Sequence, residues 1–254
     1  MVHSTALVHP QARIGPDCEI GPYCVIGAHV ELGAGCRLVS HVVIDGHTRL
    51  GNQNEIYPFA SIGLKTQDLK WKGGLTRTEI GDCNTIRENV TIHSATSEGE
   101  TTRIGSHNNI LAGSHIGHNV VIGNRVIVSM AALAGHVTVE DHAIVGGLSA
   151  VHQFCRLGTM SIIGGCSKIV QDVPPFMLVD GNPAETRTIN KVGLERNGVK
   201  EEAQAALRQA FKILFREGLT IPNALTRIEQ EVQLLPEIQH LIGFVRSSER
   251  GVTK

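Results

Sequence analysis

The fold is decided by residues 8–32, which read VHPQARIGPDCEIGPYCVIGAHVEL and carry an aliphatic residue at every sixth position. The same spacing runs from Val2 to Ile62, resumes in phase at 80–92 and 104–128, and continues after one shortened step at 133–169. A period of six matches neither the 3.6 residues of a helix nor the two residues of an ordinary strand. It is the hexapeptide signature of a parallel β-helix.

Each hexad is expected to form one short strand and one turn, and three hexads form one triangular coil. The aliphatic residue points inward and stacks on its equivalent in the next coil. The glycine that often follows it, as in Ile14-Gly15 and Ile122-Gly123, is expected to permit the tight corner. About nine coils would stack into a prism on the order of 40 Å long. One coil cannot bury its own core, so only a stack is stable.

Composition and charge narrow the class of protein. The chain has 254 residues, 28 of them glycine, and a formal net charge of −1, which argues against general nucleic-acid binding. No apolar run approaches a membrane span, and hexads that start at Val2 leave no room for a signal peptide. We therefore expect a cytoplasmic protein that does not insert into membranes.

The cysteines fit a reducing compartment. Cys18, Cys24, Cys36 and Cys155 each follow an inward aliphatic residue by four positions, and no Cys-x-x-Cys pair is present. This pattern predicts small buried thiols that are used neither in disulfides nor as metal ligands.

The hexads are interrupted twice and then stop. The interruption at 63–79 carries Asp68, Lys70 and the single Trp, which favours a functional loop, whereas the interruption at 93–103 is rich in Ser, Thr, Glu and Gly and suits a solvated excursion. After Pro183 the apolar pattern becomes helical over 201–217, from Pro222, and again after Pro236. We predict a β-helix domain over 1–186 and a small helical domain over 187–254 that caps the prism.

Histidines mark a candidate site. Of 13 His residues, five fall in the middle coils at positions that do not point inward: His115, His118, His136, His142 and His152. His118 and His136 are 18 residues apart, so three hexads per coil should bring them to the same wall of adjacent coils. Imidazole suits general-base catalysis near neutral pH. A zinc site is the competing interpretation, but no Cys or carboxylate completes a ligand set, so we expect no metal.

Several segments together resemble the UDP-N-acetylglucosamine O-acyltransferase family, which starts lipid A synthesis. They span nearly the whole chain, and the most specific are Gln67-Asp68-Leu69-Lys70, His115-Ile116-Gly117-His118, Leu133-Ala134-Gly135-His136, Val151-His152-Gln153-Phe154-Cys155 and Gly181-Asn182-Pro183. The resemblance implies a left-handed parallel β-helix and a homotrimer with its active sites between subunits. It implies a 3-hydroxyacyl chain on acyl carrier protein as donor, the 3-position of a UDP-sugar as acceptor, and no cofactor.

The resemblance also implies roles for individual residues. His118 matches the general base, and the backbone amide of Gly135 matches the group that stabilises the oxyanion. Gly165 and Pro183 match the acyl-chain pocket. The positions that match substrate contacts are Asp68, Lys70, His115, His136, His152, Gln153, Asn190 and Arg196.

The chain departs from the family pattern at four places. Asn119 stands where some members carry Asp, Asn197 where an Arg is common, and Pro183 where some have His; the segment before His136 is one residue shorter. An amide at 119 can accept the imidazole N–H but does not stabilise imidazolium as a carboxylate does.

Other functions stay open at this point. The sister N-acyltransferase has an N-terminal uridine-binding domain, which this sequence lacks, and an acetyl-CoA-dependent acetyltransferase would differ in its thioester donor. A zinc-dependent β-helix lyase and a non-catalytic scaffold come from other classes. The acceptor atom could be a 3-hydroxyl or a 3-amino group.

Overall fold

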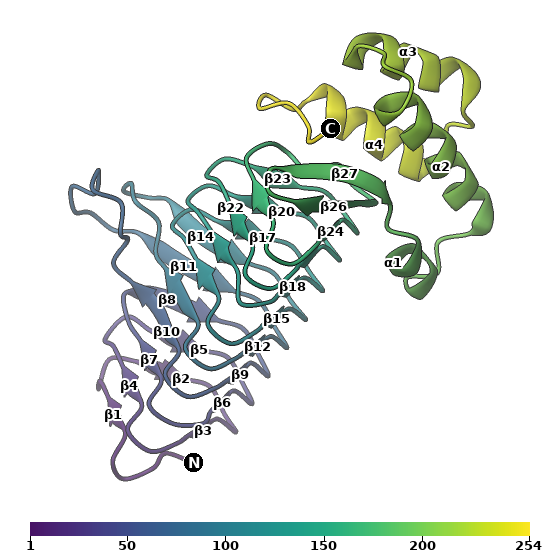
Figure 1. The fold of residues 1–254 in the computed structure, drawn as a ribbon. Helices are drawn as coiled ribbons and strands as arrows, with labels where there is room; N and C mark the ends of the chain where they lie inside the picture. Colours follow the sequence, from purple (N-terminus) through teal and green to yellow (C-terminus); the bar gives the residue numbers. More distant parts are fainter.

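The computed structural model describes residues 1–254 and shows a three-sided parallel β-helix followed by a small helical unit (Figure 1). Up to β25, successive strands belong to three different sheets, so each sheet forms one wall of the prism and contains every third strand; β26 and β27 then extend the third sheet. All neighbouring strands are parallel, except β26 and β27, which pair antiparallel at the C-terminal end.

The strands follow the hexads one by one. Wall 1 contains β1 (Leu7–Val8), β4 (Val25–Ile26), β7 (Val43–Ile44), β10 (Ser61–Leu64), β13 (Thr91–His93), β16 (His115–Ile116), β19 (Ala132–Leu133), β22 (Ala150–Val151) and β25 (Lys168–Ile169). Wall 2 contains β2 (Arg13–Ile14), β5 (Glu31–Leu32), β8 (His47–Leu50), β11 (Arg77–Ile80), β14 (Thr101–Ile104), β17 (Val121–Ile122), β20 (Thr138–Val139) and β23 (Arg156–Leu157). Wall 3 contains β3 (Glu19–Ile20), β6 (Arg37–Leu38), β9 (Glu55–Ile56), β12 (Thr85–Ile86), β15 (Asn109–Ile110), β18 (Ile127–Val128), β21 (Ile144–Val145), β24 (Ile162–Ile163), β26 (Met177–Gly181) and β27 (Ala184–Ile189).

The core of the prism is the column of inward aliphatic residues predicted from the period. Those from Ile20 to Ile169 belong to one cluster of 38 buried residues, which also contains Cys18, Cys24, Cys36 and Cys155. Val8 and Ile14 are partly buried against the cluster, and the prediction is wrong for Val2, which is exposed at the N-terminal end of the prism. Burial raises the pKa of the Cys155 thiol to about 11, so this cysteine stays an unreactive thiol at neutral pH. The prediction of small buried thiols is confirmed for these four residues.

The reason given for the glycines is wrong. Gly15 and Gly33, each directly after an inward residue, do not adopt positive φ. A Cβ on Gly15 would instead lie 2.6 Å from the carbonyl carbon of Gly33 in the next coil, so close stacking of coils demands the glycine. The left-handed corner residue lies two positions later and is usually not glycine, as at Asp17 (φ 58°) and Asn119 (φ 60°).

The two interruptions form loops at one corner, between walls 1 and 2, which we call the 1–2 corner. They comprise 65–76 and 94–100, and they project from one side of the prism in Figure 1. The Oγ1 atoms of Thr66 and Thr96 are 3.0 Å apart, which joins the loops. The expectation that the second loop is a solvated excursion is wrong for residues 94–96, which are buried beneath the first loop.

The helical unit packs against the C-terminal end of the prism. It contains α1 (Lys191–Arg196), α2 (Glu201–Phe215), α3 (Ile221–Glu231) and α4 (Pro236–Arg246). A second core of 19 buried residues joins these helices to Met177 and Ile189 of the last two strands. Helix α1 was not predicted, and β27 extends beyond the boundary placed at 186/187. None of these helices is long and apolar enough to cross a membrane.

Candidate active site

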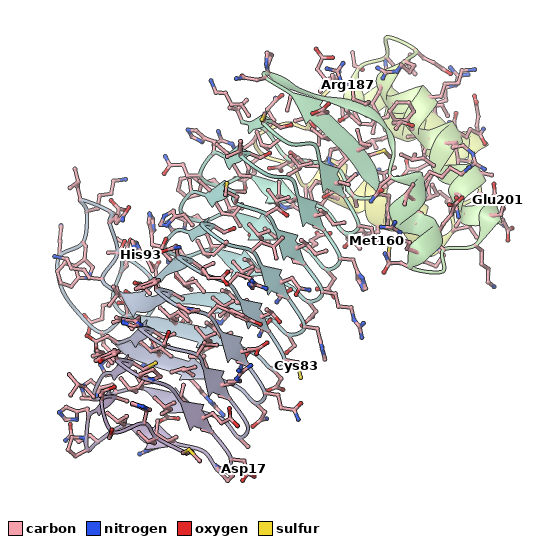
Figure 2. All side chains as sticks on the ribbon, turned by 60° about the horizontal axis from the view of Figure 1, so that its bottom comes forward. Asp17, Cys83, His93, Met160, Arg187 and Glu201 are labelled. Atoms are coloured by element: carbon pink, nitrogen blue, oxygen red, sulfur yellow. The ribbon has the colours of Figure 1, made fainter.

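A polar cleft of about 560 Å³ lies at the 1–2 corner, beneath the loop at 65–76. The loop contributes one side of the cleft and the corner residues of four successive coils contribute the other. Figure 2 shows His93 on this side of the prism, below the projecting loops, and Asp17, Cys83 and Met160 along a different edge. The cleft is lined by Gln67, Asp68, Leu69, Lys70, His93, His115, Gly117, His118, Ala134, Gly135 and Gln153.

His118 and Gly135 occupy equivalent positions in adjacent coils. Each lies two residues after an inward aliphatic residue, Ile116 and Leu133, and these two residues pair across the coils. The imidazole of His118 therefore lies over Gly135, where any Cβ would overlap its Cε1 and Nε2 atoms. Glycine at 135 is thus required for the position of the His118 ring.

The two ring nitrogens of His118 have different surroundings. Nδ1 lies 2.9 Å from Oδ1 of Asn119. Nε2 points into the cleft, 3.8 Å from Oδ2 of Asp68, which is beyond hydrogen-bonding distance. Asp68 is itself held by the backbone N–H of Lys70, which donates to its Oδ1 over 2.9 Å. The His118 side chain is 15% exposed, so its reactive nitrogen is partly shielded yet reachable.

Three further imidazoles surround His118. The His136 ring meets it edge-on, with centroids 5.2 Å apart, so the two residues are neighbours in adjacent coils. The predicted placement on one wall is wrong: both lie at the 1–2 corner, and the shortened step before Leu133 puts Gly135, not His136, opposite His118. The His115 ring lies 5.1 Å from that of His93. Desolvation by burial, helped by the charge of neighbouring histidines, lowers the pKa of His93, His115 and His136. These three rings are therefore neutral at pH 7.

Gly135 lines the cleft, and its backbone N–H has no hydrogen-bond partner in the chain. The amides of its neighbours Ala134 and His136 donate to Val151 and His118 carbonyls, over 3.1 and 3.0 Å, but Gly135 donates to no atom. An unpaired N–H beside an imidazole can donate a hydrogen bond to an oxygen atom of a ligand. The His118 imidazole and the Gly135 amide are together suited to acyl transfer, in which a base removes a proton and a backbone N–H stabilises an oxyanion.

Comparison with known proteins agrees with this geometry. Residues 172–253 match the family described as Udp N-acetylglucosamine O-acyltransferase, Domain 2, and residues 11–46 match the bacterial transferase hexapeptide (six repeats). Over 203 residues the chain is 47% identical to the acyl-[acyl-carrier-protein]--UDP-N-acetylglucosamine O-acyltransferase of Ectopseudomonas mendocina, covering 79% of each chain. The chain belongs to the UDP-N-acetylglucosamine O-acyltransferase family.

Solved structures support the same assignment. The crystal structure of LpxA from Acinetobacter baumannii is 45% identical, with a TM-score of 0.96 over 100% of this chain and 99% of that one. LpxA from Bacteroides fragilis is 38% identical, with a TM-score of 0.98 over the full length of both chains. The predicted fold class, a left-handed parallel β-helix with a C-terminal helical unit, is confirmed, as is the predicted family.

Not every residue singled out through the family resemblance lies in this cleft. His152 is exposed one coil further on, where Nδ1 approaches Nη2 of Arg250 at 3.4 Å. Asn190 caps α1, accepting from the backbone N–H of Gly193 and donating to the Met160 carbonyl. Arg196 ends α1 and Pro183 lies in the β26–β27 turn. Gly165 lies at the corner between walls 3 and 1, the 3–1 corner.

Some site residues were not predicted. His93 lines the cleft, and its signal was its place one strand before His115 in the same wall. Glu100 and Thr96 contact Asn119 from the second loop, and nothing in their spacing indicates this, because the loop interrupts the period.

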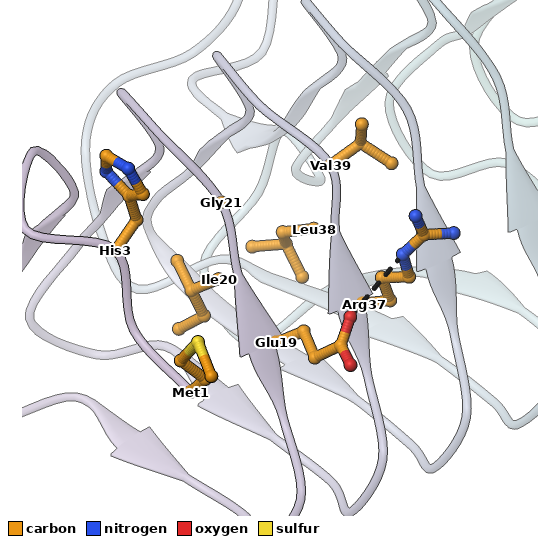
Figure 3. A pocket seen from close by; sticks show the side chains of 8 residues that line it. All are labelled: Met1, His3, Glu19, Ile20, Gly21, Arg37, Leu38 and Val39. Atoms are coloured by element: carbon orange, nitrogen blue, oxygen red, sulfur yellow. Dashed lines mark ion pairs between the residues drawn. The ribbon is translucent and has the colours of Figure 1, made fainter.

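One other hollow lacks the chemistry of the cleft. A hollow of about 300 Å³ at the N-terminal end of wall 3 is lined by apolar Ile20, Leu38 and Val39 and the Glu19–Arg37 ion pair (Figure 3). It lies where the stack of coils ends and contains one histidine, His3. No three His, Cys, Asp or Glu side chains of the chain are grouped so as to hold a metal ion.

Proposed function

We propose that the protein transfers a 3-hydroxyacyl chain from acyl carrier protein to the 3-hydroxyl of UDP-N-acetylglucosamine, the first step of lipid A biosynthesis, in the cytoplasm. The relatives' names give the donor carrier, the UDP-sugar and O-acylation. The observation that carries the mechanism is His118, with Nε2 directed into the cleft and a free Gly135 amide beside it.

His118 would act as the general base. As the sugar oxygen attacks the thioester carbonyl, the hydroxyl proton passes to Nε2, and the carbonyl oxygen becomes an oxyanion that the Gly135 N–H stabilises. When the tetrahedral intermediate collapses, the carbon–sulfur bond breaks and the imidazolium returns the proton to the leaving thiolate. No acyl-enzyme forms, so the buried cysteines take no part.

The surrounding groups would bind substrate. Asp68 and Lys70 on the loop, with His115, His136 and Gln153 on the prism, offer a carboxylate, an ammonium and neutral imidazoles to the hydroxyl and phosphate groups of a UDP-sugar. Because burial keeps the three neighbouring imidazoles neutral, only His118 among them needs to change charge during turnover.

A homotrimer would complete the site. Within one chain, Gly165 and the cleft lie at different corners of the prism, so an acyl pocket that contains Gly165 can meet the base only across a subunit boundary. The 3–1 corner also carries apolar side chains more than half exposed, at Tyr23, Phe59, Met130 and Leu148, as expected of a surface that packs against another chain. Four further residues lie outside the cleft and would contact substrate in the assembled trimer: His152, Pro183, Asn190 and Arg196.

A turnover assay tests the function. Native protein should acylate UDP-N-acetylglucosamine from 3-hydroxyacyl carrier protein. The UDP-sugar with a 3-amino group serves as the alternative acceptor, and acetyl-CoA serves as the alternative donor.

His118→Ala should lose about 10²–10⁴-fold in turnover and remain folded, because it removes the base. Near-native turnover of this variant would remove His118 from the mechanism, and a single-chain mass by light scattering at full activity would contradict the trimer.

A further inference from the structure

Asn119 lies at the centre of a hydrogen-bond network behind the proposed base. Its Oδ1 is 2.9 Å from Nδ1 of His118 and accepts the backbone N–H of Thr96 over 3.0 Å. Its Nδ2 donates to Oε2 of Glu100 over 2.7 Å. Its own backbone N–H donates to Oγ1 of Thr102 over 2.8 Å.

These partners leave one orientation for the amide. A backbone N–H can only donate and an ionised carboxylate can only accept. If the Asn119 amide were turned over, its NH₂ group would face the Thr96 N–H and its oxygen would face the Glu100 carboxylate. Two donors would then face each other at Thr96 and two acceptors at Glu100. The Asn119 Oδ1 must therefore face His118.

The amide orientation in turn determines the tautomer of His118. Because Oδ1 is an acceptor, the neutral imidazole must carry its proton on Nδ1 to form the 2.9 Å bond. The lone pair then resides on Nε2, the nitrogen that faces Asp68 and the cleft. This is the tautomer that a general base requires.

We propose that Glu100 is a positioning residue for catalysis, which acts through Asn119 to hold His118 with Nδ1 protonated and the Nε2 lone pair in the cleft. The inference rests on the proposed function of His118. Glu100 belongs to the second loop. Position 119 carries no carboxylate, and Glu100 supplies one that reaches His118 indirectly, through the Asn119 amide.

The Glu100 carboxylate is itself held in place. The backbone N–H of Ser97 donates to Oε2 over 3.0 Å. The hydrogen bond from Asn119, with help from Ser97, outweighs burial and lowers the pKa of Glu100, so the carboxylate is ionised throughout the neutral range. The other titratable groups that face His118 are Asp68, His93, His115 and His136.

The first test replaces the acceptor. In Glu100→Ala one of the two contacts that fix the Asn119 amide is lost, and only the Thr96 N–H still opposes the turned-over orientation. Both orientations should then be populated, so turnover should fall about 10-fold, less than for loss of the base itself, with little change in KM. Histidine side-chain ¹⁵N NMR should show His118 protonated on Nδ1 in the native protein and a mixture of tautomers in Glu100→Ala. Glu98→Ala, an exposed carboxylate of the same loop that does not contact Asn119, is the matched control and should match the native protein in both readouts.

The second test moves the charge. In Asn119→Asp two carboxylates would lie at the 2.7 Å separation of the present pair, and activity should fall. In Asn119→Asp/Glu100→Gln the Gln amide can donate to the new carboxylate at position 119, so activity should recover to within about tenfold of native. The acid limb of the kcat/KM profile should then move to higher pH, because a carboxylate now touches the imidazolium.

Three results would overturn the proposal. They are full activity with a native His118 tautomer in Glu100→Ala, equal activity of Asn119→Asp and the double variant, or an acid limb that does not move. The NMR readout needs no substrate, so it also separates this proposal from the proposed function. If the native protein transfers no acyl chain, the tautomer still reports whether Glu100 orients Asn119.

Discussion

At the scale of the residue, the site depends on one glycine and one amide. Gly135 is needed because the His118 ring occupies the space of its Cβ, and its φ is not in the left-handed region. Asn119 adopts φ 60°, which Asn tolerates better than most residues, and so combines the corner conformation with an acceptor for His118. Sterics and hydrogen bonding thus select different residues at neighbouring corner positions.

Gly135→Ala tests the steric argument. The added methyl group would displace the His118 imidazole, and we expect a loss of at least about tenfold in turnover, since a small misplacement of a base is costly. The far-ultraviolet circular dichroism spectrum should stay native, because a side-chain ring and not the backbone is displaced. Gly243→Ala is the control, since that exposed helical position has open space and should keep native turnover. Native activity of Gly135→Ala would show that the ring does not need this site.

At the scale of the element, three buried asparagines stack in successive coils and form a ladder of hydrogen bonds. Asn54, Asn84 and Asn108 are each 1% exposed and lie in successive coils at the corner between walls 2 and 3. Nδ2 of Asn84 donates to Oδ1 of Asn54 and to the Gly105 carbonyl, and its Oδ1 accepts the Asn108 backbone N–H. Each amide therefore satisfies backbone groups that the corner leaves unpaired.

Replacing the middle member should destabilise the prism. Asn84→Ala leaves the Asn108 N–H and the Gly105 carbonyl without these partners in a buried corner, and each orphaned group costs about 1–3 kcal/mol. Urea unfolding at a fixed protein concentration should show the loss. Asn109→Ala, one residue beyond the ladder on the exposed outer face, should leave the unfolding midpoint unchanged. Equal midpoints for the two variants would refute a stabilising role for the ladder.

The period of six predicts what repeats and misses what interrupts it. It correctly places the inward residues from Ile20 onward, because they follow from three hexads per coil. It brings His118 and His136 into adjacent coils but misses their offset by one residue, because the shortened step before Leu133 puts Gly135 opposite His118. It does not show that the second loop folds back onto Asn119, since a loop has no register from which to predict its contacts. Helix α1 was missed because six residues with a Gly present almost no amphipathic pattern.

At the scale of the whole molecule, the two cores are joined by a few polar and aromatic contacts. The Arg156 guanidinium lies 4.2 Å from the centre of the Phe244 ring in α4, and Ser248 donates to the buried Asp172 over 2.8 Å. Nε2 of His240 in α4 lies 2.7 Å from Oε2 of Glu140, which also accepts from the Thr159 hydroxyl. The last of these pairs makes the docking of the helical unit depend on pH.

The direction of that dependence follows from the two groups. The hydrogen bond to Glu140 raises the pKa of His240, although burial and the charge of Arg156 oppose it. Burial raises the pKa of Glu140, but hydrogen bonds from His240 and Thr159 outweigh it and lower the pKa overall. A raised histidine pKa gives stability that is complete below the ordinary 6.5 and is lost as pH rises through the folded value. A lowered carboxyl pKa gives stability that is complete above the ordinary 4.5 and is lost as pH falls.

The pair should therefore stabilise the docked helical unit most between pH 4.5 and 6.5. We expect the difference in thermal midpoint between the native protein and His240→Gln to be largest in that window and to shrink toward pH 8. His107→Gln is the control, because His107 is an exposed corner residue without a carboxylate partner. Limited proteolysis of the helical unit at pH 6 and pH 8 should follow the same order, because only the docked unit protects its helices. A midpoint difference that stays constant from pH 5 to pH 8 would show that His240 contributes by packing against Phe176 and not by its charge.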